Sequence, residues 1–232
     1  MKFTILTIFP SSLESYINSS IIQKASKKGL IEIEIINIRK KPWQQVDDYA
    51  YGGKSGMVLK IEPIVEALKE HQLLDKHIVL LTPTGTTLKQ SLIKDLVKHK
   101  HIVMICGHYE GIDARIENYI SQEISIGDYV LTSGELGAMV LLDSITRLVP
   151  NVINQESLQT ESFDCDLLDF PVYTRPQEFD GHKVPDIYLN GNHKEIEKFR
   201  LREQERITKE KRPDLYNKYI DKKRKNLKYK NS

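Results

Sequence analysis

Short apolar runs alternate with longer amphipathic stretches along the first 150 residues of the chain. The apolar runs are rich in isoleucine and valine and end at turn residues, a pattern that predicts β-strands. The stretches between them repeat apolar residues at the spacing of one helix face. We therefore predict strands at residues 3–9, 31–38, 77–83, 101–107 and 123–132, and helices at 12–28, 62–72, 88–100, 113–120 and 135–149.

This alternation predicts an α/β fold, in which a parallel sheet carries helices on its faces, and by itself favours an ordinary doubly wound sheet. The chain turns polar from Gln155 to Asp166, which we interpret as a mobile linker, and beyond it becomes helical and basic. We therefore expect two domains, at residues 1–160 and 169–232, with a flexible connection at 161–168.

Charge is distributed unevenly between these parts, although the whole chain carries a net charge of only +2. The last 40 residues contain 15 Lys and Arg against 7 Asp and Glu, a balance of +8 that leaves −6 for the first 192 residues. A basic tail on an acidic body favours a polyanionic partner, with nucleic acid first. A solvated helix laced with opposite charges at i,i+4 explains the same tail equally well.

Few features of the sequence indicate export or a membrane. Cys106 and Cys165 are the only cysteines, and the first residues, MKFTILTIFPSS, form too short an apolar run for a signal peptide. The longest apolar runs, such as residues 102–106, fall far short of the ~20 residues that a membrane span needs. We expect a cytoplasmic protein with no membrane segment.

Three glycine-bearing loops follow three successive predicted strands, at residues 82–87, 107–111 and 126–137. Ligands of open α/β sheets bind beyond the carboxyl ends of the strands, so three loops at one edge predict one pocket. Its walls would be mainly backbone and apolar side chains, a lining that can hold an adenine by its edge. Any one of these loops could be only a tight turn, and their conjunction favours the pocket.

Two common nucleotide-binding motifs and the usual zinc motifs are absent. No G-x-G-x-x-G turn follows the first predicted strand. The segment YGGKSG (51–56) ends like a phosphate-binding loop, but Asp48 occupies the position where that motif needs its first glycine. The histidines show no H-E-x-x-H and no paired spacing with cysteine, so we predict no metal-binding residues.

The chain resembles the bacterial tRNA (guanine-N1)-methyltransferases, the TrmD family, over essentially its whole length. The segments that carry the resemblance are TIFP (7–10), YGGKSGM (51–57), TPTG (82–85), CGHYEGID (106–113), SIGDYVLTSGELGAM (125–139), LLDFPVYTRP (167–176) and GNHKEI (191–196).

The resemblance implies a trefoil-knotted parallel-sheet domain of the SPOUT type, followed by a small helical C-terminal domain that binds tRNA. It implies S-adenosylmethionine as methyl donor, with magnesium assistance, and the guanosine at tRNA position 37, next to the anticodon, as acceptor. It also implies an obligate homodimer whose active sites are shared between subunits. The segment 135–149 is apolar around most of its circumference, which predicts a helix in the core or in an interface, and the resemblance favours the interface.

By the same resemblance the glycine loops thread through one another to form the knot and hold the methyl donor. Tyr109 and Tyr129 could equally be buried ring packing. The strongest expectations of direct contact are Gly107, Ile126, Gly127, Tyr129 and Leu131. The full set of expected cofactor-binding residues is Thr82, Pro83, Gly85, Gly107, Tyr109, Glu110, Gly111, Ile126, Gly127, Asp128, Tyr129, Val130, Leu131, Gly134 and Gly137.

Asp169 matches the residue to which the family assigns the role of general base. Considered without the family, it is a turn-forming aspartate before Pro171. Negative charge that develops on the guanine carbonyl oxygen requires a cation or an amide donor, either Arg175 or a residue of the partner subunit. The expected RNA-binding residues are Lys54, Arg175, His193, Arg200 and Arg202.

The sequence departs from the family pattern at a few positions and leaves two alternatives open. Ala50 precedes Tyr51, Lys54 fills the third position of a glycine triplet, and His108 replaces a common arginine. A non-catalytic RNA-binding protein could keep the same fold and basic tail. A knotted methyltransferase that acts on ribose or on ribosomal RNA is the alternative enzyme, although the segment LLDFPVYTRP argues against it.

Overall fold

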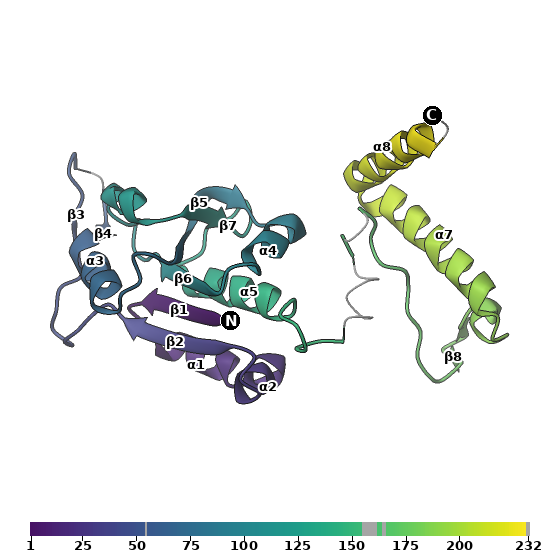
Figure 1. The fold of residues 1–232 in the computed structure, drawn as a ribbon, viewed down its shortest axis with the longest axis horizontal. Helices are drawn as coiled ribbons and strands as arrows, with labels where there is room; N and C mark the ends of the chain where they lie inside the picture. The colour runs from purple at the N-terminus through teal and green to yellow at the C-terminus, as the bar shows by residue number, and fades with distance from the viewer. Residues whose placement is uncertain (54, 155–161, 164–165, 231–232) are drawn as a thin grey trace. The chain divides into compact units, whose positions relative to one another are not determined.

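The structure is a computed structural model that describes residues 1–53, 55–154, 162–163 and 166–230 (Figure 1). The chain divides into two compact units, Met1–Asn154 and Gln155–Ser232. Among the described residues, no helix combines the length and the apolar character needed to cross a lipid bilayer.

The first unit is built on a five-stranded sheet in the order β2-β1-β6-β5-β7. All neighbouring strands run parallel, which confirms the parallel α/β arrangement predicted from the alternating pattern. The strands are β1 (Lys2–Thr7), β2 (Glu32–Asn37), β5 (His77–Thr87), β6 (His101–Cys106) and β7 (Gln122–Ser125).

Helices cover both faces of this sheet (Figure 1), which explains why its central strands are apolar at nearly every position. Phe3 and Met104 point to a core shared with helices α1 (Ser11–Ile17), α2 (Ser20–Lys27), α4 (Gln90–Leu96) and α5 (Glu135–Thr146). Leu6 and Ile105 point to the opposite core, against α3 (Ile61–Glu70) and the 3₁₀ helix η1 (Ala114–Tyr119).

Several predicted elements have different bounds in the structure. The single helix predicted at 12–28 is wrong, because this segment forms two helices, α1 and α2. Ser20, the first residue of α2, has a φ of 47°. The helix predicted at 113–120 is the 3₁₀ helix η1. The short antiparallel hairpin of β3 (Asp47–Tyr49) and β4 (Met57–Leu59) was not predicted.

The strand predicted at 123–132 is also wrong beyond Ser125, where β7 ends and a loop begins. The Ser125 hydroxyl accepts from the Gly127 N–H at 3.3 Å and donates to the Gly127 carbonyl at 3.0 Å. These bonds replace those of a continuing strand and turn the backbone at a glycine with a φ of 152°.

Strand β5 is interrupted by a bulge that projects its glycine-containing segment out of the sheet. Leu81 and Thr86 are both opposite Ile124 of β7, so the residues between them leave the ladder. A Cβ on Gly85 would lie 2.4 Å from the backbone nitrogen of Ile124, and only glycine allows the two strands to approach so closely.

The second unit contains two long helices, α7 (His193–Lys211) and α8 (Pro213–Lys230). The hairpin of β8 (Glu178–Phe179) and β9 (His182–Lys183) and the 3₁₀ helix η2 (Asp186–Tyr188) precede them. The Asn192 side chain accepts from the Glu195 N–H at the start of α7, and Pro213 begins α8 at a position where proline loses no helical hydrogen bond.

Candidate functional site

The bulged segment of β5 and the loops that follow β6 and β7 surround one cavity at the carboxyl edge of the sheet. Its volume is about 490 Å³, within the range of about 300–1,000 Å³ that is typical of small-molecule sites. Its lining comprises Thr82–Thr84, Gly107–Ile112 and Ile126–Gly134 except Asp128, together with parts of β5, η1, β7 and α5.

The cavity brings together the predicted cofactor-binding residues except Gly85 and Asp128. Gly85 lies in the bulge of β5 against Ile124 of β7, where its lack of a side chain permits the close backbone approach described above. Asp128 is exposed beside Gly127. Direct contact with a cofactor stays a prediction for all of these residues.

Gly134 lies at a second close backbone approach, between the start of α5 and the end of β6. Its N–H donates to the Gly107 carbonyl at 2.8 Å. A Cβ on Gly134 would lie 2.7 Å from Cys106 Cα and 2.8 Å from the Gly107 nitrogen, so the site excludes any side chain. The last loop of the pocket is therefore held directly against the loop after β6.

Tyr129 folds its ring over Gly127, where a Cβ would lie 2.4 Å from the ring carbon Cε1. Tyr129 and Tyr109 are 54% and 40% exposed as residues, so neither is the buried core residue that one interpretation of the sequence suggested. Both tyrosines lie at the cavity and are open to a ligand. Tyr109 has a φ of 61°, a left-handed conformation that is uncommon outside glycine and marks a constrained loop.

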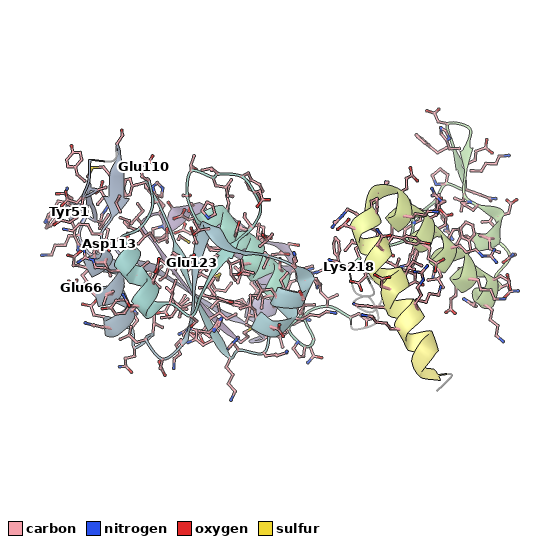
Figure 2. All side chains as sticks on the ribbon, turned by 90° about the horizontal axis from the view of Figure 1, so that it is seen from above. Tyr51, Glu66, Glu110, Asp113, Glu123 and Lys218 are labelled. Carbon is pink, nitrogen blue, oxygen red and sulfur yellow. The ribbon has the colours of Figure 1, made fainter. Side chains whose placement is uncertain are left out.

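The lining is acidic as well as apolar. Glu110, Glu117 and Glu123 border the cavity, and no Lys or Arg is found among the described residues that line it. Figure 2 labels Glu110 and Glu123. The Thr84 hydroxyl donates to Glu123 Oε2 at 3.1 Å and orients this carboxylate. An acidic wall attracts a cationic ligand and repels a phosphate.

A buried carboxylate lies at the N-terminus of α5, outside the residues that line the cavity. The Thr7 hydroxyl donates to Glu135 Oε1 at 2.5 Å and accepts from the Phe9 N–H at 2.8 Å. Burial, and to a smaller extent the nearby charge of Glu135, raises the pKa of the Cys106 thiol well above its ordinary value. Because the thiolate is the nucleophilic form, Cys106 is unsuited to covalent catalysis.

The unpredicted β3–β4 hairpin forms part of the support of the pocket. The Glu110 N–H donates to the Met57 carbonyl at 3.0 Å, and the Leu59 N–H donates to the Gly111 carbonyl at 2.9 Å. The family motif at 51–57 is thereby tied to the motif at 106–113, a pairing between distant segments that no local pattern reveals. Lys54 lies outside the described residues.

His108 also lines the cavity, between two aromatic rings. Its ring centroid is 5.0 Å from that of Phe9 and 5.1 Å from that of Tyr109. His108 Nδ1 is buried and has no hydrogen-bond partner among the described residues. Histidine at this departure from the family pattern thus packs as a flat ring.

Asp169 belongs to the second unit, where it is half-buried. Its N–H donates to the Ser162 hydroxyl at 2.9 Å, and its Oδ1 accepts from the Phe170 N–H at 2.7 Å. These bonds suit an aspartate that shapes a turn, and they also hold its carboxylate in one orientation.

The predicted RNA-binding residues of the second unit fall into two environments. Arg175, His193 and Arg202 are exposed. Arg200 is half-buried, with its guanidinium carbon 4.7 Å from the centre of the Phe170 ring and 5.9 Å from that of Tyr188. Their contact with RNA stays a prediction.

Fold and site together define the class of this protein. It is an α/β protein with a small-molecule pocket formed by glycine-containing segments at the carboxyl edge of a parallel sheet. A helical unit follows in the chain. The chain belongs to the family described as tRNA (Guanine-1)-methyltransferase TrmD, whose model matches residues 1–218. The resemblance that the motifs indicated is thereby confirmed.

Similar proteins from several bacteria match almost the entire chain. A tRNA (guanine-N(1)-)-methyltransferase of Mycoplasma capricolum is 52% identical over 219 residues, which cover 93% of this chain and 91% of the relative. The protein of the same name from Ureaplasma urealyticum is 50% identical over 97% of this chain and 100% of the relative. That from Clostridioides difficile is 48% identical over 96% of this chain and 100% of the relative.

Proposed function

We propose that this protein transfers a methyl group from S-adenosylmethionine to the ring nitrogen N1 of guanosine in tRNA, at position 37 beside the anticodon. The observation that carries the proposal is family membership over residues 1–218, with relatives of that activity about 50% identical over nearly the full length. Because the proposed substrate is tRNA, we also propose that the protein works in the cytoplasm.

The cavity fits the proposed methyl donor in size and in charge. S-adenosylmethionine supplies an activated methyl group on a positively charged sulfonium. The carboxylates of Glu110, Glu117 and Glu123 favour a cation, and the glycine loops allow backbone groups to approach an adenosine closely. The apolar residues Ile112 and Leu131 also border this space.

We propose that the glycine loops are threaded as a trefoil knot of the SPOUT type. The two close backbone approaches, Gly85 against Ile124 and Gly134 against Gly107, support this arrangement, because a threaded chain requires segments to cross without side chains between them. Knots are rare, so the proposal rests on the family as much as on these contacts.

Asp169 is the proposed general base. Guanine N1 carries a proton at neutral pH and is a poor nucleophile until that proton is removed, which a positioned carboxylate can do. Arg175, exposed in the same unit, is the proposed source of positive charge for the guanine carbonyl oxygen. From the resemblance to the family, we also propose a homodimer whose active sites are each completed by residues of both chains.

We also propose that the second unit docks the tRNA. The charge of +8 over the last 40 residues supports this role, because neutralised phosphates release counterions and supply most sequence-independent affinity. Exposed Arg175, His193 and Arg202 are the proposed contacts, with Lys54 as a contact from the first unit.

Magnesium has no assigned role in this proposal. Among the described residues, no group of three or more His, Cys, Asp or Glu side chains is placed to hold a metal ion. Magnesium assistance, which the resemblance implies, stays a prediction with no residue assigned to the ion.

The test is mass spectrometry of transcript tRNA treated with purified protein and S-adenosylmethionine. We expect one added methyl group on the base of guanosine 37, and none on a transcript with adenosine at that position. A methyl group on a ribose would indicate the alternative enzyme. Binding of tRNA without methyl transfer, under conditions in which the cofactor also binds, would indicate a non-catalytic RNA-binding protein.

A further inference from the structure

The segment that carries Asp169 is attached to α7 by side chains on both sides of it. Leu167 is buried, with 4% of its surface exposed. The Leu168 N–H donates to the Thr208 hydroxyl at 2.8 Å, and the Phe170 ring lies 4.7 Å from the Arg200 guanidinium carbon. Asp169 is thus held between a hydrogen bond and a stacking contact that both come from α7.

Thr208 is well suited to hold this backbone. It has no exposed surface, and its hydroxyl donates to the Gln204 carbonyl one helical turn earlier, at 2.6 Å. Because its single proton is used within the helix, the hydroxyl oxygen is left to accept from Leu168. A β-branched side chain in a helix has few rotamers, so the acceptor has a defined position.

Arg200 lies two helical turns before Thr208 and forms the second attachment. Its guanidinium packs on Phe170 and lies 5.9 Å from the centre of the Tyr188 ring, which itself makes an edge contact with Phe199. Arg200 Nε is buried without a hydrogen-bond partner among the described residues. Such a packed arginine contributes a flat stacking surface more than a charge offered to phosphate.

The contacts continue from Phe170 to the carboxylate. The Phe170 N–H donates to Asp169 Oδ1, so a shift of Phe170 displaces the group that orients this oxygen. A third contact, an ion pair between Asp166 and Lys222 of α8, contributes less because the Lys222 side chain is exposed to water.

We propose that α7 positions the general base. Within this helix, Thr208 and Arg200 are the positioning residues for Asp169. The inference rests on the proposed function, in which Asp169 removes the N1 proton. It adds that Asp169 is attached to α7, a helix of the unit proposed to dock tRNA. Docking of the substrate would therefore also position this general base. It assigns Arg200 to positioning and leaves phosphate contacts to the exposed basic residues.

The experiment compares full-length Thr208→Val and Thr208→Ser in single-turnover methylation at saturating cofactor and tRNA. Valine keeps the shape and removes the acceptor, whereas serine keeps the hydroxyl. We expect the valine variant to turn over on the order of tenfold more slowly, because small displacements of a catalytic group are costly. Its dissociation constant for tRNA should stay within about twofold, and serine should restore most of the rate.

Two further variants make the test specific. Arg200→Lys keeps the charge and loses the flat stacking surface, so it should slow turnover and leave tRNA affinity unchanged. Thr146→Val removes the hydroxyl of an equally buried threonine, which has no hydrogen-bond partner among the described residues, and should turn over like the parent. Hydrogen exchange should rise at the Leu168 amide in Thr208→Val only.

The outcomes separate this inference from the proposed function. Parent-like turnover and exchange in Thr208→Val, beside an inactive Asp169→Asn, overturn the positioning role alone. Loss of tRNA affinity in parallel with turnover in Thr208→Val or Arg200→Lys also overturns it, because α7 would then act only through RNA docking. If Asp169→Asn turns over like the parent, the assignment of the base fails first.

Discussion

Glycines around the pocket serve different purposes at the scale of single residues. At Gly85 and Gly134 two backbone segments approach so closely that no room is left for a Cβ. Gly127 instead turns the chain with a positive φ beneath the Tyr129 ring. Gly107 has room for a side chain, since its added Cβ would lie 3.7 Å from Ile112. Glycines that look alike in the sequence therefore differ in what a substitution would cost.

Gly134→Ala is expected to destabilise the protein by about 1–3 kcal/mol, the cost of overpacking a site that cannot yield. The added carbon would meet the backbone of Cys106 at 2.7 Å, and backbone cannot rotate away as a side chain can. Urea denaturation measures the change. Gly107→Ala is the matched control, and its free energy of unfolding should stay within about 1 kcal/mol of the parent. Equal losses of unfolding free energy in both variants would contradict a close backbone approach specific to Gly134.

Asp169→Asn is expected to lower single-turnover methylation by ~10²–10⁴-fold, the usual contribution of a general base. Asparagine retains an oxygen that can accept from the Phe170 N–H, so the fold and the affinity for S-adenosylmethionine should be kept. Rapid-quench measurement of methylated tRNA gives the rate, and calorimetry gives the affinity. A rate within a few-fold of the parent would leave Asp169 as a turn residue.

Helix α5 connects the pocket to the rest of the first unit at the scale of elements. It contacts β1, β6 and helices α1, α2 and α4. The Tyr16 hydroxyl of α1 donates to Asp143 Oδ2 of α5 at 2.6 Å. This hydrogen bond, and to a smaller extent desolvation, raises the pKa of Tyr16 to about 12. The bond joins two segments that lie 127 residues apart.

Tyr16→Phe is expected to cost about 1.5 kcal/mol of unfolding free energy near neutral pH, the value of a hydrogen bond to a charged group. Because the folded pKa is raised, the contribution is complete below pH 10 and is lost as pH rises towards about 12. Denaturation of both proteins at pH 8 and at about pH 11 measures the difference. Tyr49→Phe, at a side chain 80% exposed, should show no such cost. A difference between Tyr16→Phe and the parent that does not shrink with rising pH would refute the assignment.

The elements themselves were largely predictable because their signal is local. Each of the five sheet strands was expected from its apolar run, and α3 and α5 from theirs. The errors fall where a local turn interrupts an apolar pattern, as at Ser20, which has a positive φ, and at the end of β7, where Ser125 bonds to Gly127. The β3–β4 hairpin was missed because its strands have only three residues each.

At the scale of the whole molecule, α5 supports the proposed homodimer. Leu136 and Val140, one turn apart on a helix that is otherwise largely buried, are 52% and 44% exposed. A pair of exposed apolar side chains on an apolar helix is consistent with an interface. Both lie in the first unit, which also holds the cavity.

Leu136→Asp is therefore expected to shift the protein from dimer to monomer and to abolish methyl transfer. Charge placed in an apolar interface is costly, and each active site is proposed to need both chains. Sedimentation at assay concentration measures the assembly. Leu74→Asp, at a leucine of similar exposure outside α5, is the control and should remain dimeric. An active Leu136→Asp monomer would refute the shared site.

The uneven charge of the chain leads to a prediction about salt. Binding of tRNA should weaken steeply as salt rises, and Arg202→Gln should reduce the slope of log affinity against log salt by about 1, the effect of one lost phosphate contact. Lys98→Gln, at an exposed lysine of the first unit paired with Asp95, should leave the slope unchanged. Filter binding over a salt series measures both. Equal slopes for Arg202→Gln and the parent would show that Arg202 contacts no phosphate.

The sequence by itself determined the five strands of the parallel sheet, several of the helices and the family, because apolar periodicity and contiguous motifs are local properties of a chain. It also indicated most residues that line the cavity, since glycine loops after parallel strands must share one edge. Only the tertiary structure decided which glycines permit close backbone approaches and that Arg200 packs on Phe170. Those properties depend on contacts between residues far apart in the sequence, which arise only when the chain is folded.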